Sequence, residues 1–205
     1  MSNTKAIKHL NSDPVLAKLI KTLAPIEHKP ESESDFYITL LRSVVGQQLS
    51  VKAAATIYQR FLNLFPSGYP NPEEVFLQPV EILRSVGLSG QKAGYVRAVA
   101  EFKLSGQLEP EVISHLDDEA LIKHLTKIKG VGRWTAEMLL MFALDRSDVL
   151  PLDDLGIQNA FKKLYGLTEE KKALHARMVE IAEAWKPYRT LACKYLWRSL
   201  DNMPK

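Results

Sequence analysis

The sequence predicts an all-α protein of about ten helices packed as a bundle-like globule. Apolar residues return every three or four positions along most of the chain, whereas the alternation typical of strands is nearly absent. Several of these segments begin with serine or aspartate, which are preferred at helix N-caps. With 46% hydrophobic and 25% charged residues, the chain has the composition of an ordinary globular protein with a buried core.

The first half of the chain contains four predicted helices. Asp13, an N-cap candidate, and Pro14, at a first helical position, begin the helix at 12–20. Helical spacing of apolar residues predicts the next three, at residues 35–48, 50–65 and 89–106. The segment 50–65 opens on Ser50, a candidate cap. The proline-dense stretch 66–79 is expected to be a loop with at most short helical turns.

The second half contains five further predicted helices. Their residues are 117–125, 132–144, 153–166, 169–185 and 186–200. The helix at 132–144 starts directly after a pair of glycines, and the helix at 153–166 starts at two adjacent aspartates. No low-complexity tract, long linker or simple tandem repeat separates the halves.

Composition and charge exclude several classes of protein. Cys193 is the only cysteine, so one chain can form neither a disulfide nor a cysteine zinc site nor an iron–sulfur cluster. The apolar runs are too short to cross a bilayer, and the N-terminus lacks a signal-peptide core, so we expect no membrane partner. We expect an intracellular monomer, in the cytoplasm or nucleoid of a bacterium or the nucleus of a eukaryote. A net charge of +3 permits nucleic-acid binding without demanding it.

The string "IKGVGRWTA" suggests an anion-binding turn between two helices. Glycine at positions 130 and 132 allows positive φ and leaves backbone N–H groups accessible at the start of the next helix. Helix N-termini attract anions, and Lys127, Lys129 and Arg133 add positive charge, so a phosphate is the expected ligand. The alternative is a plain interhelical turn in which one glycine is a C-cap.

Two adjacent acids, Asp153 and Asp154, precede the predicted helix 153–166. One of them is sufficient as an N-cap, and the other is expected to face elsewhere. A carboxylate near a helix N-terminus should be ionised at neutral pH, where it can stabilise a cation or act as a base for water.

These motifs, taken in order, resemble the helix-hairpin-helix DNA glycosylase superfamily. "IKGVGRWTA" is similar to its hhxGhGxxxA hairpin, and "VLPLDDLGI" follows about twenty residues later, as its proline–aspartate segment does. "RSVVGQQLSVKAAATIYQRF", "VGLSGQKAGYVRAVA" and "AWKPYRTLACKYLW" extend the resemblance over roughly residues 35–200. The subfamily that it resembles most is 3-methyladenine DNA glycosylase II.

The resemblance implies two helical lobes with an active-site cleft between them. Lobe one is about 36–148, with the hairpin at 126–136, and lobe two is about 1–35 plus 149–205.

The resemblance also implies roles for the acids and tryptophans. Asp154 matches the catalytic aspartate, with Asp153 as its structural partner, and Trp134 and Trp197 match positions that line the pocket for a flipped base. Met138 and Leu155 are expected to line the same pocket, whereas Trp185 is expected in the core. Trp134 stands where bifunctional relatives carry a lysine nucleophile, so the resemblance implies no Schiff base and no strand-nicking activity.

Contacts with the DNA backbone and helix stack follow from the same resemblance. "VGQQLS" matches the loop that carries the wedge residue, for which Gln48 is preferred over Gln47 and Leu49. Ser89 and Lys92 in "GLSGQKAGY" offer a second phosphate contact, although Ser89 is equally well read as a simple N-cap. Family hairpins hold a monovalent cation through carbonyls, here those of Thr126, Ile128 and Val131.

The implied function is a monofunctional DNA glycosylase in base excision repair. It would hydrolyse the N-glycosidic bond of alkylated purines (3-methyladenine and 7-methylguanine) in double-stranded DNA, without a cofactor other than that cation. A purine that is already cationic leaves as a neutral base, so one anion and no proton donor suffices. Two alternatives stay open: a non-catalytic module that binds DNA lesions, and a glycosylase for neutral deaminated bases.

Overall fold

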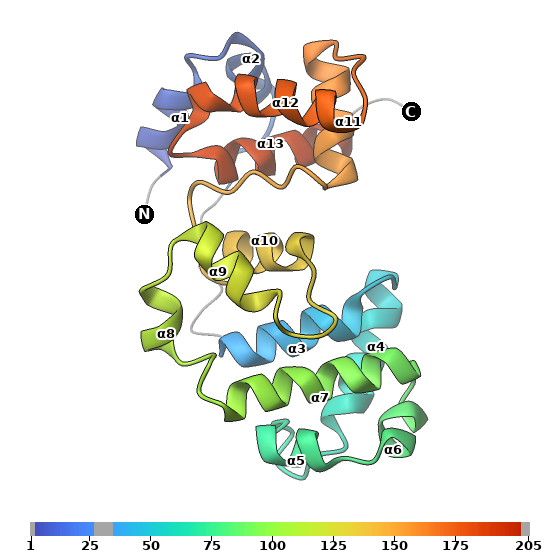
Figure 1. Cartoon of the computed structure of the whole chain (residues 1–205). Helices are drawn as coiled ribbons and strands as arrows, with labels where there is room; N and C mark the ends of the chain where they lie inside the picture. The colour runs from blue at the N-terminus through green and yellow to red at the C-terminus, as the bar shows by residue number, and fades with distance from the viewer. Residues whose placement is uncertain (1–2, 27–34, 202–205) are drawn as a thin grey trace. The chain divides into compact units, whose positions relative to one another are not determined.

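The computed structural model describes residues 3–26 and 35–201, and every regular element in them is a helix (Figure 1). The predicted all-α class is therefore confirmed. The chain divides into two compact units: unit 1 comprises residues 1–32 and 140–205, and unit 2 comprises residues 33–139. No described helix is both long and apolar enough to span a membrane.

The unit boundaries differ from the lobe boundaries expected from the sequence. The first, between residues 32 and 33, lies outside the described residues. The second falls inside helix α10 (Arg133–Phe142), after Leu139, and not near 148. The end of α10 belongs to unit 1 because Phe142 packs there, with its ring stacked against Trp197 at a centroid distance of 5.9 Å.

Unit 2 is organised around α7 (Gly90–Leu104), which packs against α3 (Phe36–Gly46) and α5 (Pro72–Leu77). Figure 1 shows α3 and α7 side by side in this unit. Small and β-branched residues of α7 are fully buried, which lets the neighbouring backbones approach closely: Ala93, Val96, Val99 and Ala100. The remaining helices of unit 2 are α4 (Val51–Leu62), α6 (Val80–Ser85), α8 (Pro110–Ser114) and α9 (Asp118–Leu125), followed by the first part of α10.

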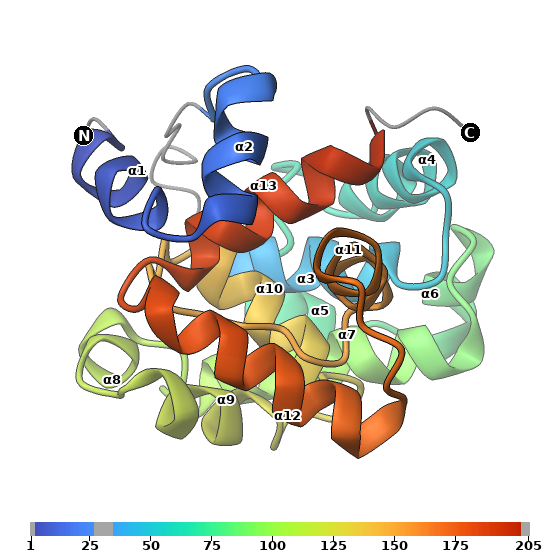
Figure 2. The same ribbon diagram turned by 90° about the horizontal axis from the view of Figure 1, so that it is seen from above.

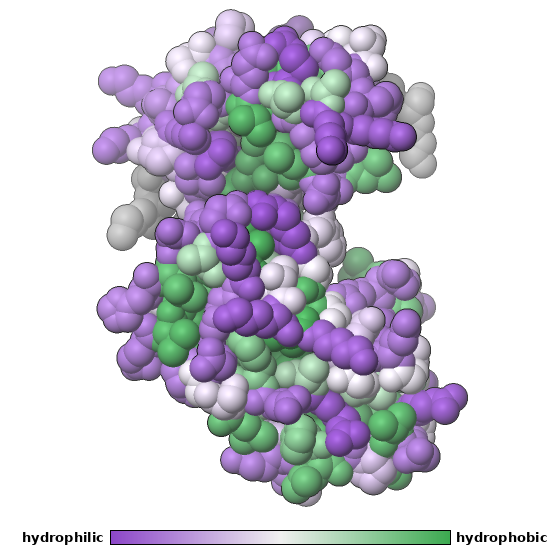
Figure 3. Space-filling model, in the orientation of Figure 1, coloured by the Kyte–Doolittle hydropathy of each residue, from purple (hydrophilic) through white to green (hydrophobic). Residues whose placement is uncertain are grey.

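The proline-dense stretch 66–79 is more helical than the sequence suggested. It contains the whole of α5, which Asn71 caps by accepting a hydrogen bond from the Glu73 N–H. The short helices α6 and α8 were not predicted, because a helix of five or six residues carries too few turns to show a period. Apolar residues reach the surface over α5 and α6, where Leu77 and Ile82 are exposed (Figure 3).

Unit 1 is built around α13 (Arg189–Asp201), which packs against α2 (Pro14–Thr22) and α11 (Leu155–Tyr165). Figure 2 shows α13 running beside these helices. Its core includes Trp185 of the 3₁₀ helix η1 (Glu183–Trp185), which is fully buried as predicted. The helices α1 (Thr4–Leu10) and α12 (Lys171–Ala182) complete unit 1. The short polar α1 was not predicted.

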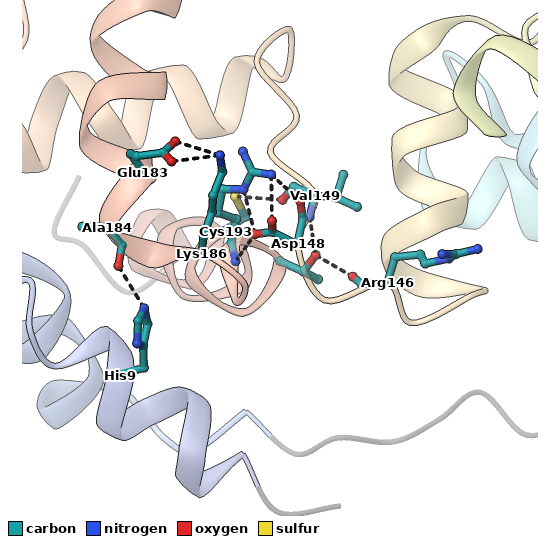
Figure 4. Close-up of polar contacts among 10 residues, drawn as sticks. His9, Arg146, Asp148, Val149, Glu183, Ala184, Lys186 and Cys193 are labelled. Carbon is teal, nitrogen blue, oxygen red and sulfur yellow. Dashed lines mark hydrogen bonds and ion pairs between the residues drawn. The ribbon is translucent and has the colours of Figure 1, made fainter. Parts of the chain in front are cut away.

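Segments far apart in the sequence are joined within unit 1 by polar contacts (Figure 4). The Thr190 hydroxyl donates to the carbonyl of Arg146 and accepts from the N–H of Val149. Arg189 binds the carboxylate of Asp148. These bonds fix the segment that leads from α10 to the two adjacent acids at the start of α11.

Candidate functional site

The hairpin of unit 2 joins α9 to α10, and Gly130 sets its geometry. Gly130 has φ of +92°, a conformation that residues with a Cβ rarely adopt. A Cβ at this position would also lie 2.2 Å from Cγ of Tyr95. The positive φ that glycine allows is thus used at Gly130. Gly132 is outside the positive-φ region and exposed, with open space where a Cβ would be.

The predicted basic cluster around the hairpin is reduced to two exposed lysines, Lys127 and Lys129. Arg133 instead pairs with carboxylates: its Nε donates to Glu137 over 2.9 Å, and its Nη1 donates to Glu119 over 3.1 Å. These bonds raise the pKa of the Arg133 guanidinium and lower the pKa of the Glu119 carboxyl. Arg133 thus has carboxylate partners within unit 2, which the sequence did not predict, and its contact with phosphate stays a prediction.

The loop after α3 brings a strained residue to the surface. Gln48 is exposed and adopts φ of +58°, which is uncommon for a residue other than glycine. Gln47 has a different role, because its side-chain amide donates to the carbonyl of Gly130 over 2.9 Å and to the hydroxyl of Thr135 over 3.4 Å. The loop is therefore fastened to the hairpin through Gln47, and Gln48 stays the candidate wedge. Leu49, the third candidate, is 37% exposed.

Lys92 and Ser89 have structural partners in unit 2. The ammonium of Lys92 donates to the carbonyls of Val45 and Gln47 over 2.8 and 2.6 Å, at the C-terminal end of α3. Burial lowers the pKa of this ammonium. Two of the three N–H donors of Lys92 are thus used by backbone carbonyls, and its predicted phosphate contact stays a prediction. Ser89 accepts from the Lys92 N–H and is the N-cap of α7, the simpler of its two readings.

The turn that contains Thr126, Ile128 and Val131 supplies carbonyl oxygens, the donor type that a hard monovalent cation prefers. The Ile128 carbonyl accepts the Val131 N–H over 3.0 Å, which closes the turn and uses one of its two lone pairs. These oxygens fit such an ion in kind. No group of three histidine, cysteine or acidic residues that could hold a metal occurs among the described residues.

In unit 1, Asp154 is the N-cap of α11. Its Oδ1 accepts the backbone N–H of Ile157 and the indole Nε1–H of Trp197, each over 2.8 Å. We expected Asp154 to be the catalytic residue and Asp153 its structural partner. This expectation is wrong in one respect, because Asp154 itself caps the helix. Asp153 is exposed, and its Oδ1 lies 3.8 Å from Nε2 of His175.

The indole that binds this carboxylate is itself part of an aromatic pair in unit 1. Trp197 is half-buried and stacks on Phe142, whose ring is 45% exposed. The ammonium of Lys194 lies 5.3 Å from the centroid of Phe142, and burial lowers its pKa. Phe142 and Lys194 were missed from the sequence. Phe142 lies in an apolar run that is typical of a core, and no signal distinguished it from its buried neighbours.

The four predicted pocket residues divide between the units. Trp134 and Met138 lie on α10 in unit 2, where Trp134 is 45% exposed and Met138 is half-buried. Leu155, 70% exposed, and Trp197 lie in unit 1. Single exposed apolar residues are common on protein surfaces, so the exposure of Trp134 and Leu155 does not by itself mark a binding surface. Their role as a base pocket stays a prediction.

Together, the fold and the site define an all-α protein with a glycine-dependent helix-hairpin-helix and with Asp154, at the start of α11, bound by the half-buried indole of Trp197. A family model described as HhH-GPD superfamily base excision DNA repair protein matches residues 41–187. The chain belongs to the HhH-GPD superfamily.

Curated and solved relatives extend over nearly the whole chain. The chain is 38% identical to DNA-3-methyladenine glycosylase 1 of Schizosaccharomyces pombe over 202 residues, which cover 97% of this chain and 88% of that protein. The structure of an S. pombe 3-methyladenine DNA glycosylase (Mag1) in complex with abasic DNA is similar, with a TM-score of 0.84 and 36% identity, covering 98% of this chain and 100% of that one. A DNA-3-methyladenine glycosidase of Bacillus halodurans gives a TM-score of 0.84 at 35% identity, covering 98% and 90%.

Proposed function

We propose that this protein is a monofunctional DNA glycosylase that releases alkylated purines, such as 3-methyladenine and 7-methylguanine, by hydrolysis of the N-glycosidic bond. The observation that carries the proposal is Asp154, held at the N-terminus of α11 by two hydrogen bonds to Oδ1. The names of the relatives at 35–38% identity support the same substrate class. Because its proposed substrate is genomic DNA, the enzyme would act in the cellular compartment that contains this DNA.

The proposed chemistry follows from the charges of enzyme and substrate. As the bond to an alkylated purine breaks, positive charge develops on the deoxyribose and the base departs neutral. A carboxylate at this position stabilises that developing cation, or serves as a base for the attacking water. No proton donor for the leaving group is required.

Hydrolysis without strand cleavage is part of the proposal. A lyase needs an amine that forms a Schiff base with the sugar. Trp134 occupies the position after the hairpin where the resemblance would place such a lysine. We therefore expect an abasic site as the end product and no nicked strand.

Binding of double-stranded DNA by a monomer is proposed from unit 2. The exposed Gly132, at the start of α10, and the two lysines at 127 and 129 suit a phosphate of one strand. Gln48, exposed on its strained loop, is proposed as the wedge that replaces the extruded nucleotide. A monovalent cation held by the carbonyls of Thr126, Ile128 and Val131 would add positive charge to this turn and so attract the phosphate.

The test is a release assay on methylated duplex DNA with wild-type protein and the Asp154→Asn variant. We expect the wild type to release 3-methyladenine and 7-methylguanine, and Asp154→Asn to release neither above the spontaneous rate. Absence of release by the wild type, with DNA binding intact, would instead support a lesion-binding module. Faster release of hypoxanthine or uracil than of methylated purines would support a glycosylase for neutral bases.

A further inference from the structure

We propose that Trp197 is a positioning residue whose indole N–H fixes the carboxylate of Asp154, and that Gly156 provides the space for this contact. The inference rests on the proposed glycosylase function, which makes Asp154 the catalytic group. It assigns to Trp197 a role through its nitrogen, separate from any stacking of its ring on a base.

The geometry at Asp154 supports a positioning role. Two donors, the backbone N–H of Ile157 and the indole N–H of Trp197, meet on the same oxygen, Oδ1, each over 2.8 Å. The backbone donor comes from the same helix that Asp154 caps, whereas the indole donor comes from a residue 43 positions away in the sequence. The second donor adds a restraint on the carboxylate that the cap bond does not supply. The carboxylate is thus held before a substrate arrives.

Gly156 provides an independent argument for the same contact. It lies in the first turn of α11 and outside the positive-φ region, so its backbone conformation does not require glycine. Glycine inside a helix costs about 1 kcal/mol relative to alanine, so another reason for it is needed. A Cβ there would lie 3.0 Å from Cδ1 and 3.1 Å from Nε1 of Trp197, and 3.1 Å from Oδ1 of Asp154. Glycine keeps open the space in which the indole and the carboxylate meet.

The indole is also held at its ring. Phe142 stacks on Trp197 with an interplanar angle of 30°, so the direction of the N–H is defined by packing. The residue as a whole is half-buried, and its nitrogen donates to Asp154 in a part-buried bond. The stacked ring and this bond together orient the carboxylate.

The experiment compares Trp197→Phe, which keeps an aromatic ring but removes the N–H, with Gly156→Ala, which crowds the contact. Single-turnover release of 7-methylguanine and the Kd for duplex DNA with a non-cleavable abasic analogue are measured for each. Trp185→Phe is the matched control, since it removes an indole N–H that binds a different aspartate, Asp13. Assays are run well below the Tm of every variant.

We expect Trp197→Phe to lower the single-turnover rate by roughly tenfold or more while the Kd changes less than about threefold. Gly156→Ala should lower the rate in the same way, and Trp185→Phe should leave it within about twofold. The double variant of positions 156 and 197 should be no slower than the slower single variant, because both changes break one interaction.

Two outcomes would overturn the inference while leaving the proposed function intact. One is a Trp197→Phe rate within about twofold of wild type, which would reduce Trp197 to a ring for packing or stacking. The other is a double variant whose single-turnover rate is lowered by the product of the two factors measured for the single variants. If Trp197→Phe does not fold, a Gly156→Ala rate equal to wild type would have the same consequence. A wild type that releases no methylated base would overturn the proposed function and this inference with it.

Discussion

Unit 1 contains two aspartates that begin helices and bind a tryptophan indole, and they differ in their surroundings. Oδ1 of Asp13 accepts the N–H groups of Val15 and Leu16, and its Oδ2 accepts the Trp185 indole and the Tyr165 hydroxyl, each over 2.9 Å. At Asp154, the cap bond and the indole bond both fall on Oδ1.

The partners of the two aspartates explain this difference. Trp185 is fully buried and stacks on Phe161, so its N–H must find a partner inside the protein. Trp197 is half-buried beside an exposed Phe142. The same cap and the same donor therefore stabilise the core at Asp13 and present a carboxylate near the surface at Asp154. An aspartate cap is not evidence of function until its neighbours are known.

The largest expected effect separates the two aspartates by activity. Asp154→Asn should lower the single-turnover release rate by about a thousandfold or more, because asparagine keeps the cap but carries no charge. Asp13→Asn should leave the rate within about threefold. Release of 7-methylguanine from duplex DNA measures both. Equal losses in the two variants would show that the aspartates are functionally alike and break the comparison.

The second-largest expected effect is a difference in the free energy of unfolding between variants of Asp13 and Asp154. Asp13→Ala should reduce the free energy of unfolding by about 2–4 kcal/mol, because it removes a cap and leaves the N–H of buried Trp185 unpaired. Asp154→Ala should cost only about 1 kcal/mol, the usual value for a cap. Urea denaturation of the three proteins measures the difference. A larger loss for Asp154→Ala would reverse the roles assigned here.

The Asp13 cluster should also contribute a pH dependence to stability, through the Tyr165 hydroxyl that donates to Asp13. Burial, then the charge of Asp13 and the bond to it, raise the pKa of Tyr165 above its ordinary value of 10.0. The unfolded chain therefore loses this proton first, and the contribution of Tyr165 is complete below pH 10 and declines above it. Tyr165→Phe should be less stable than wild type by about 1 kcal/mol at pH 8.

The gap between the two proteins should close at a rate of up to ~1.4 kcal/mol per pH unit above pH 10. Denaturation curves from pH 8 to pH 11 test this. Other tyrosines of raised pKa, including Tyr37, lie in unit 2 and titrate in both proteins, so the difference isolates Tyr165. A gap that stayed constant with pH would mean that folding does not raise the pKa of Tyr165.

The smallest effect on stability and on the release rate is expected for substitution of Asp153, the acid next to Asp154. Asp153 is exposed and lies 3.8 Å from His175, so Asp153→Asn should change stability by less than about 0.5 kcal/mol. The release rate should stay within about twofold, because the charge removed is not the one held by Trp197. A loss comparable to that of Asp154→Asn would move the catalytic role to residue 153.

Local features of the molecule were predictable from the sequence. The caps at Asp13, Ser50 and Ser89 bond to N–H groups two or three residues ahead, and all three are confirmed. The turn at Gly130 was predictable for the same reason. Such features depend on backbone groups within one helical turn, which the sequence itself brings together.

Other features depend on distant residues, whose contacts the sequence did not predict. Lys92 was expected to contact phosphate but binds carbonyls at the end of α3, 45 and 47 positions away. Arg133 was expected at the phosphate but pairs with Glu119, 14 positions earlier. A basic residue in a motif reveals its charge and not its partner, since partners are set by how the helices pack.

The sequence by itself determined an all-α chain, a glycine turn between two helices, and an acidic start to the helix at 155–165. Only the tertiary structure decided that Trp185, 172 positions away, binds Asp13, and that Trp197, 43 positions away, binds Asp154. The physical reason is the separation in sequence over which each interaction acts. Helical period and capping act over three or four residues. Packing between helices that are remote in the chain builds the environment that makes one of two similar aspartates a candidate catalyst.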